Sequence, residues 1–285
     1  DWRDGIGPVE KRPRKRDLAW KSIETNEVGL DEFMKWADAA EVAPIYAVNL
    51  GTKGIEEALA VLEYCNMETG TYYSDLRAAN GHEKPYGIRT WCLGNEMDGD
   101  WQIGHKTAEE YGRIAYETGK AMKILDPSIE LVACGSSMST NSTFGDWEQT
   151  VLEHCYPCLD YISLHQYYGG QEKGTAEFLA QSLDMERYIE TVLNICDYVR
   201  VKKKMSHKIN ICFDEWGVWS MSDVQVQKSV EDAPWQTAPA ISEQIYTMED
   251  ALLFASMLMN FIKRADRVKI ACQSLLTNIS SCIMT

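Results

Sequence analysis

The feature that most restricts the possible folds of this chain is a set of six short apolar runs that alternate with longer helical patterns. Each run is nearly continuous in apolar residues, which is typical of parallel strands covered on both faces. Repeated strand-and-helix units predict an α/β protein with a parallel sheet, either open and doubly wound or closed as a (β/α)8 TIM barrel. The runs occupy residues 43–50, 88–94, 129–135, 161–167, 209–216 and 267–272.

Three helices are predicted between these strands. Residues 107–125 carry apolar or small side chains at a helical period, and Thr107 and Glu110 form a capping box at their start. Residues 183–204 repeat the period. Residues 249–265 begin with acidic and end with basic side chains, as the helix dipole favours.

The composition excludes several classes of partner. The 28 basic and 43 acidic residues give a formal net charge of −15, so nucleic acid and anionic membranes are not expected as partners. The basic run at residues 10–16 is expected to be a solvated loop. No run of eighteen apolar residues occurs, so no membrane span is predicted. We see no linker or composition shift, and we expect one domain over residues 1–285.

The cysteines point to a reducing environment. They number nine, and most lie in apolar strand or helix patterns, which indicates buried free thiols and not a disulfide framework. The single CxxC, Cys155 to Cys158, has no second pair at a suitable spacing, so no metal site is expected there. No G-x-G-x-x-G follows a strand, and a nucleotide-binding, doubly wound sheet therefore lacks support.

Polar residues gather directly after the predicted strands, where a barrel forms its catalytic rim. They are Asn49, Asn95, Glu96, Ser136, Ser137, His165, Asp214 and Glu215. Glu96 and Glu215 are the two carboxylates that cleavage of a glycosidic bond requires, one as proton donor and one as nucleophile or base. Burial and a second carboxylate are expected to raise the pKa of the donor. Loop acids that serve only as caps and ion pairs are the structural alternative.

Neighbouring residues favour the sugar-cleaving interpretation. Asn95 can hydrogen-bond a sugar hydroxyl, and "FDEWGVW" places Glu215 between aromatic residues that can stack on a sugar. Tyr167 can donate to a nucleophilic carboxylate. His165 can orient the substrate or that carboxylate, or it can be a satisfied core histidine.

Five segments carry a family resemblance. "WCLGNEMDGDWQIGHKTAEEYG", "ELVACGSS", "DYISLHQYYG", "FDEWGVW" and "EDALL" resemble the retaining α-L-arabinofuranosidases of glycoside hydrolase family 51 along essentially the whole chain. The resemblance implies a (β/α)8 barrel with the acid/base after strand 4 and the nucleophile after strand 7. It makes Glu96 the acid/base, Glu215 the nucleophile and Asn95 the ligand of the 2-hydroxyl. His165 and Tyr167 match the active-site pair on strand 6.

The resemblance also accounts for the strand count. The six strands become strands 3 to 8 of an incomplete barrel, with strands 1 and 2 and a β-sandwich domain missing, and a strand-2 Arg and Asn of the sugar site would precede residue 1. Two positions depart from the family: Gly217 stands where Asn is usual, and Leu275 stands where a substrate-contacting Gln is usual. Gln273 is the candidate replacement as a substrate-binding residue.

The implied activity is removal of terminal α-L-arabinofuranosyl units from arabinan, arabinoxylan or their oligosaccharides. The two carboxylates would act without a metal or organic cofactor. The family also implies a homo-oligomer and a bacterial cytoplasmic location, although the polar opening of the chain does not allow a signal peptide to be judged. Two alternatives stay open: another retaining glycosidase of the clan, such as an endoglucanase or β-xylosidase, and a catalytically impaired sugar-binding fragment.

Overall fold

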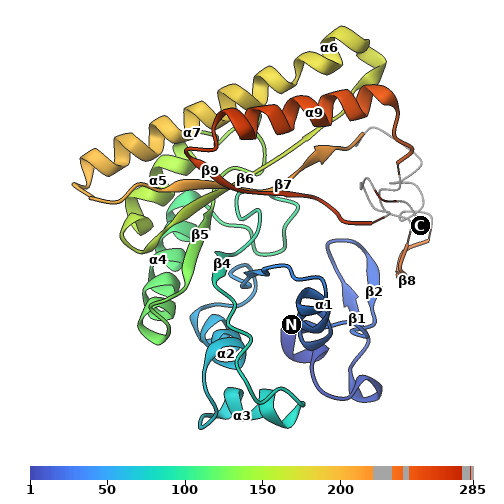
Figure 1. Cartoon of the computed structure of the whole chain (residues 1–285), viewed down its shortest axis with the longest axis vertical. Helices are drawn as coiled ribbons and strands as arrows, with labels where there is room; N and C mark the ends of the chain where they lie inside the picture. Colours follow the sequence, from blue (N-terminus) through green and yellow to red (C-terminus); the bar gives the residue numbers. More distant parts are fainter. Residues whose placement is uncertain (221–232, 240–243, 278–282, 284–285) are drawn as a thin grey trace.

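A curled sheet of six parallel strands forms the centre of the computed structural model, which describes residues 1–220, 233–239, 244–277 and 283 (Figure 1). The strands pair in chain order, without the reversal that a doubly wound sheet has. All six predicted strands are confirmed, and the sheet has the shape of a half-barrel. The strands are β3 (Ile45–Ala47), β4 (Thr90–Leu93), β5 (Glu130–Cys134), β6 (Tyr161–Tyr168), β7 (Asn210–Val218) and β9 (Val268–Gln273).

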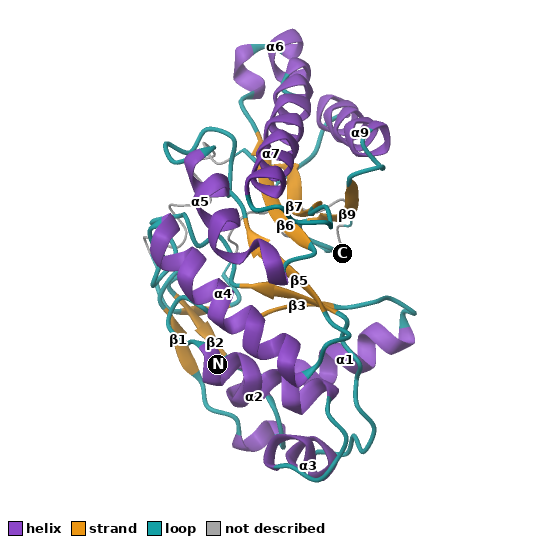
Figure 2. Ribbon diagram, turned by 90° about the vertical axis from the view of Figure 1, so that its left-hand side faces the viewer, coloured by secondary structure: helices purple, strands orange, loops and turns teal. Residues whose placement is uncertain are grey.

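Helices cover the outer side of this sheet (Figures 1 and 2). The three predicted helices are confirmed as α4, α7 and α9. At the start of α4 the Thr107 hydroxyl accepts from the Glu110 amide, and the Glu110 carboxylate accepts from the Thr107 amide at 2.9 Å, as a capping box requires. The helices are α2 (Ile55–Asn66), α3 (Tyr72–Ala79), α4 (Ala108–Leu125), α5 (Asp146–Cys155), α6 (Thr175–Ala180), α7 (Ser182–Lys202) and α9 (Met248–Lys263), with short 3₁₀ turns at Tyr156–Cys158 and Gln171–Lys173.

A second, smaller sheet joins distant parts of the chain. The hairpin of β1 (Lys15–Asp17) and β2 (Ser22–Glu24) pairs through β2 with β8 (Gln236–Thr237), and the β2–β8 pair is parallel. Short 3₁₀ turns at Trp2–Gly5 and Val9–Lys11 precede the hairpin, and α1 (Leu30–Ala39) follows it.

The basic run at residues 10–16 is exposed, as predicted, at every position except Arg12. The side chain of Arg12 is only 3% exposed and pairs with Glu32 at 2.8 Å, and it also donates to the carbonyls of Gly7 and Asn26. A buried guanidinium is tolerated because these acceptors satisfy its donors. The prediction was wrong at Arg12 because the charge pattern alone does not reveal a partner twenty residues away.

The thiols agree with the prediction. Eight cysteines are free, six of them buried and two, Cys158 and Cys272, partly exposed, while Cys282 lies outside the described residues. Across the described ranges, no helix has both the length and the apolar character needed to cross a bilayer.

Candidate active site

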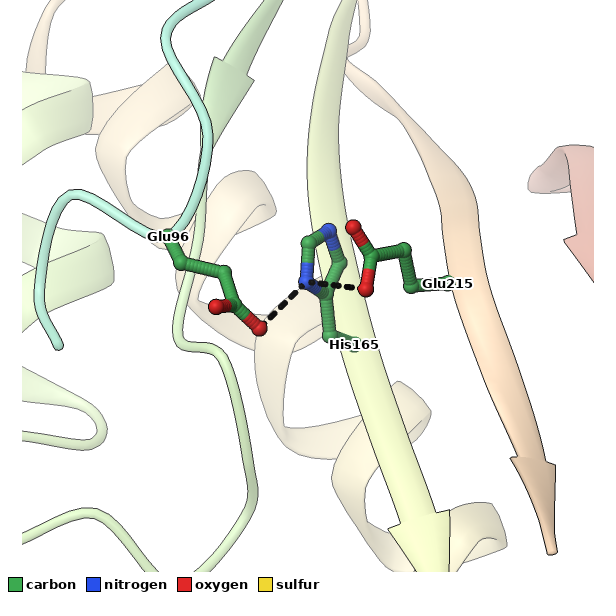
Figure 3. A group of neighbouring side chains, drawn as sticks. All are labelled: Glu96, His165 and Glu215. Carbon is green, nitrogen blue, oxygen red and sulfur yellow. Dashed lines mark hydrogen bonds and ion pairs between the residues drawn. The ribbon is translucent and has the colours of Figure 1, made fainter. Parts of the chain in front are cut away.

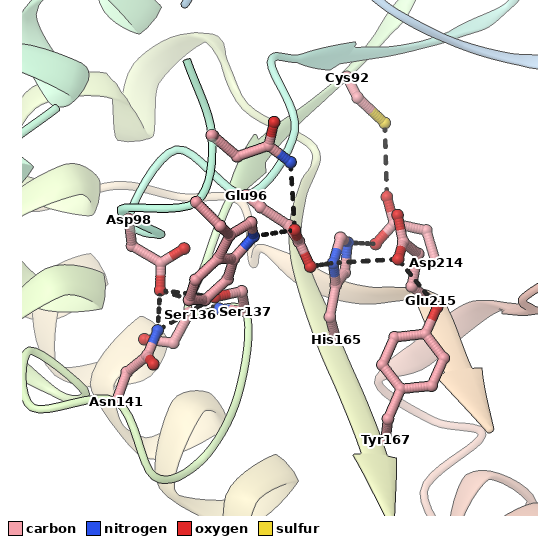
Figure 4. A network of polar contacts seen from close by, with 12 residues as sticks. Cys92, Glu96, Asp98, Ser136, Ser137, Asn141, His165, Tyr167, Asp214 and Glu215 are labelled. Carbon is pink, nitrogen blue, oxygen red and sulfur yellow. Dashed lines mark hydrogen bonds and ion pairs between the residues drawn. The ribbon is translucent and has the colours of Figure 1, made fainter. Parts of the chain in front are cut away.

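Three strands of the parallel sheet, β4, β6 and β7, bring Glu96, His165, Tyr167 and Glu215 together (Figures 3 and 4). Glu96 follows β4, the histidine and tyrosine lie on β6, and Glu215 lies on β7. His165 and Glu215 are register partners across β6 and β7. One ligand atom each of Glu96, His165 and Glu215 lies within 4.8 Å of the other two, so the parallel register places the two predicted carboxylates at one site.

Glu96 is held by three donors. Its Oε2 accepts from Trp101 Nε1 at 2.6 Å and from Gln102 Nε2 at 3.2 Å, and its Oε1 lies 3.1 Å from His165 Nδ1. Its backbone φ is +45°, a left-handed conformation that is uncommon for residues other than glycine and that concentrates at functional sites. The two donors from the following loop were not predicted, because hydrogen bonds made by irregular backbone leave no periodic signal in the sequence.

Glu215 has a different set of contacts. The Tyr167 hydroxyl donates to its Oε2 at 2.9 Å, which is the hydrogen bond expected of that tyrosine, and His165 Nδ1 lies 3.7 Å from the same oxygen. The Glu215 side chain is 30% exposed, against 15% for Glu96. Glu215 is therefore the more open of the two carboxylates.

His165 is buried and contacts carboxylates through both ring nitrogens. Nδ1 faces Glu96 and Glu215, and Nε2 lies 3.3 Å from Oδ1 of Asp214 (Figure 4). Burial opposes a charge on the imidazole, but the charges of Glu215 and Asp214 raise the pKa of His165 well above its usual value. The surrounding carboxylates therefore favour the protonated, cationic form of the ring.

The order of the two glutamate pKa values is the reverse of the expected one. Burial favours the neutral form of Glu96, but hydrogen bonds and the charge from His165, with those from Trp101 and Gln102, lower its pKa. Burial raises the pKa of Glu215, because the opposing charge of His165 and the Tyr167 hydrogen bond do not cancel it. The prediction of a raised pKa for Glu96 is wrong for the ligand-free site, because the three donors around its carboxylate outweigh the effect of burial.

The loop that carries Glu96 is fastened to the fold by two further side chains. Tyr111, fully buried in α4, donates to the Leu93 carbonyl at 2.7 Å and accepts from the Cys134 amide at 2.7 Å, so it ties the ends of β4 and β5 together. Asp98 accepts from the amide and hydroxyl of Ser137 at 3.0 and 3.1 Å. Asp98 therefore has a structural role.

The remaining predicted residues surround this centre. Asn95 is exposed and makes no hydrogen bond within the described part of the chain, which leaves its amide available to a ligand. Gln273 ends β9 and is the register partner of Trp216. A Cβ atom at Gly217 would meet only ordinary contacts, at 3.4 Å or more, so a methyl group fits there. Leu275 is 48% exposed.

The same trio of Glu96, His165 and Glu215 is the one group of three in the described residues with the spacing to hold a metal ion. A cationic imidazole has no free lone pair for a metal, since both ring nitrogens carry protons. In this charge state the three side chains are suited to proton transfer between His165 and Glu96, with Glu215 as the second carboxylate.

Comparison with known proteins identifies the family. The family model described as the α-L-arabinofuranosidase 1 domain matches residues 1–187, and the one described as the α-L-arabinofuranosidase C-terminal domain matches residues 214–285. A solved family 51 α-L-arabinofuranosidase from Bifidobacterium longum superposes with a TM-score of 0.96 at 43% identity, over 99% of this chain and 57% of that one. The chain belongs to the family 51 α-L-arabinofuranosidases.

Two curated α-L-arabinofuranosidases show how much of such a protein is matched. This chain is 56% identical to the intracellular exo-α-(1→5)-L-arabinofuranosidase 1 of Bacillus subtilis and 54% identical to the intracellular exo-α-(1→5)-L-arabinofuranosidase of Halalkalibacterium halodurans. Each alignment covers all of this chain and 56% of the relative. The chain thus spans little more than half the length of these arabinofuranosidases.

Proposed function

We propose that this chain carries the catalytic site of a retaining exo-α-L-arabinofuranosidase. The observation behind the proposal is the approach of Glu96, just after β4, and Glu215, in the second half of β7, to within 4.8 Å, oxygen to oxygen. Retaining glycosidases hold their carboxyl groups about 5–5.5 Å apart, whereas inverting ones leave about 6.5–9.5 Å for a water molecule. The short separation supports direct attack on the sugar.

In the proposed reaction the two carboxylates divide the work. Glu215 attacks the anomeric carbon, and its ester bond forms as the glycosidic bond breaks and Glu96 gives a proton to the leaving oxygen. Glu96 then takes a proton from water, whose oxygen displaces Glu215 from the sugar. The Tyr167 hydrogen bond aims one oxygen of Glu215 and stabilises its ionised form.

The substrate contacts follow from the same placement. Asn95, next to Glu96 in the chain, would bind the 2-hydroxyl, and Gln273 at the end of β9 would line the sugar site. The substrate class is a terminal α-L-arabinofuranosyl unit on an arabinan, an arabinoxylan or an oligosaccharide. The names of the two curated relatives support an exo mode of action. No metal or organic cofactor is needed, because the carboxylates supply both the nucleophile and the acid/base.

The proposal also covers the complete fold, the cellular location and the oligomeric state. The six strands correspond to strands 3 to 8 of a (β/α)8 barrel, and residues 1–285 belong to one catalytic unit. The uninterrupted chain-order pairing supports this correspondence. The free thiols and the names of the relatives support a bacterial cytoplasmic location, and the active form is a homo-oligomer.

Hydrolysis of aryl α-L-arabinofuranosides by the wild type and three variants tests the function. Glu215→Ala should abolish turnover of both nitrophenyl and dinitrophenyl substrates, because no glycosyl-enzyme forms. Glu96→Ala should slow the nitrophenyl substrate by about 10²–10⁴-fold and spare the first step for dinitrophenol, which leaves without a proton. Asp100→Ala, which removes an exposed acid from the same loop, is the control.

The stereochemistry of the first product provides a second readout. Retention of the α-anomer in a proton NMR time course supports double displacement, and inversion would refute the retaining mechanism. Binding of arabino-oligosaccharide without turnover would identify a sugar-binding fragment, and cleavage of aryl glucosides or xylosides in preference to arabinofuranosides would identify another glycosidase of the clan.

A further inference from the structure

Asp214 reaches His165 although it precedes Glu215 directly in the chain. Successive side chains of a regular strand point to opposite faces of a sheet, so only one of the two acids would normally face the histidine. The pairing of β6 with β7 shifts between Ser163 and His165, and the pairing of β7 with β9 shifts between Phe213 and Trp216. Irregularities of this kind re-aim side chains, and here both acids contact one imidazole.

The surroundings of Asp214 make His165 its main source of charge compensation. Its side chain is 17% exposed, and its Oδ1 has the ion-pair contact with Nε2 but no hydrogen bond of ordinary geometry among the described residues. Its Oδ2 accepts from the Cys92 thiol at 3.7 Å, and a thiol is a weak donor. A carboxylate in this position favours a proton on Nε2 of the histidine.

A proton fixed on Nε2 determines what the other nitrogen can do. Nδ1 lies between Glu96 at 3.1 Å and Glu215 at 3.7 Å. In the cationic ring it donates to Glu96, and in the neutral ring with Nε2 protonated it can only accept from a protonated Glu96. Glu96 and Nδ1 therefore share a single proton.

We propose that Asp214 is a positioning residue that keeps a proton on Nε2 of His165, so that Nδ1 stores the proton that Glu96 transfers. The proposal rests on the role of Glu96 as acid/base in the proposed function. In the step itself the Nδ1–H bond breaks, the Oε1–H bond of Glu96 forms, and the imidazolium becomes a neutral imidazole. Glu96 then passes this proton to the leaving oxygen as Glu215 attacks.

This placement explains the reversed order of the glutamate pKa values. In the ligand-free site His165 holds the proton, so Glu96 is ionised there without losing its function as a donor. The groups that face the imidazole are Glu96 after β4 and Asp214 and Glu215 on β7, and Tyr167 on β6 contacts Glu215. The single positive charge of the protonated His165 is thus shared among three carboxylates.

Nitrogen-15 NMR of the full chain labelled in its five histidines tests the proposal without substrate. The resonances of His165 are assigned by their loss in His165→Gln. In the wild type, Nε2 should stay protonated from pH 5 to 9 while Nδ1 titrates. In Asp214→Asn the Nδ1 midpoint should fall by at least about one pH unit, because an opposite charge is removed, and the neutral ring should populate both tautomers. Asp100→Asn removes an exposed acid that does not face His165 and should change neither quantity.

Glu96→Gln, which keeps the size of the side chain, gives an independent check should Asp214→Asn not fold. The Nδ1 midpoint should again fall, but Nε2 should keep its proton because Asp214 is intact. A wild-type spectrum with Nε2 deprotonated in the neutral ring would overturn the proposal without any variant. So would a midpoint in Asp214→Asn within about 0.3 pH units of the wild type.

The test separates this proposal from the proposed function. The chain could show the expected tautomers, with Nε2 protonated in the wild type, and yet cleave no arabinofuranoside. That result would refute the proposed function and would still support the role of Asp214 toward His165. Cleavage by double displacement with an unchanged tautomer in Asp214→Asn would refute only the positioning role.

Discussion

Replacing Tyr111 by Phe isolates the contribution of one hydroxyl to the geometry of the active-site loop. The hydroxyl bridges the Leu93 carbonyl and the Cys134 amide inside the core, and Glu96 follows Leu93 by only three residues. The phenyl ring of the variant keeps the stacking on Trp147, whose centroid lies 5.4 Å away, so no cavity forms. The loss is confined to two hydrogen bonds.

The expected cost follows from the two groups that lose their partner. A buried polar group left without a hydrogen bond costs about 1–3 kcal/mol. The Leu93 carbonyl retains a weak contact with the Cys134 thiol at 3.8 Å, which favours the lower part of that range for the carbonyl. Tyr111→Phe should therefore lower the free energy of unfolding by about 2–4 kcal/mol.

Urea denaturation followed by tryptophan fluorescence and circular dichroism measures this change. Tyr72→Phe is the matched control, because that side chain is 75% exposed and has no hydroxyl hydrogen bond among the described residues, and it should change the free energy by less than about 0.5 kcal/mol. If Tyr111→Phe behaved like this control, the hydroxyl would not be what joins the ends of β4 and β5.

Three further outcomes are expected. Hydrogen bonds from Arg12 hold the pKa of Glu32 to about 2, below its unfolded value, so Glu32→Gln should cost about 1–2 kcal/mol at pH 7. This contribution is complete above about pH 4.5 and is lost as the pH falls towards 2, so urea melts of the two proteins should draw closer at pH 3 and converge near pH 2. Asn95→Ala should lower kcat/KM on an aryl arabinofuranoside by about 10²-fold with an unchanged melt, and an effect below fivefold would contradict its role as a sugar ligand. Gly217→Ala should leave stability unchanged or raise it by up to about 1 kcal/mol, and a large loss would show that the space beside Phe254 is not available.

The sheet could be predicted from the sequence because its four central strands, β4 to β7, are mostly buried on both faces and read as continuous apolar runs. The strands of the small sheet could not, because "KRD" in β1 and "SIE" in β2 are short and charged. Their pairing depends on tertiary contacts, not on local preference.

The candidate site, like the fold, could be predicted only in part from the sequence. The strand-end positions of Glu96 and Glu215 follow from the alternation of strands and helices, and parallel pairing brings them together. The contact between Asp214 and His165 depends on irregular register in β7, which no periodicity reveals. The pKa order was missed for the same reason, because it depends on which of four touching groups holds the proton.

The pairing of β2 with β8 has a consequence for the order in which the chain can fold. Each strand of the large sheet joins the strand that emerged just before it, so that sheet can grow in step with synthesis. Ser22 instead pairs with Gln236, roughly 210 residues later in the chain. Closing so long a loop costs conformational entropy, and the pairing of two short strands offsets little of that cost. We expect this small sheet to be the last part of the molecule to close and the first to exchange its amide hydrogens.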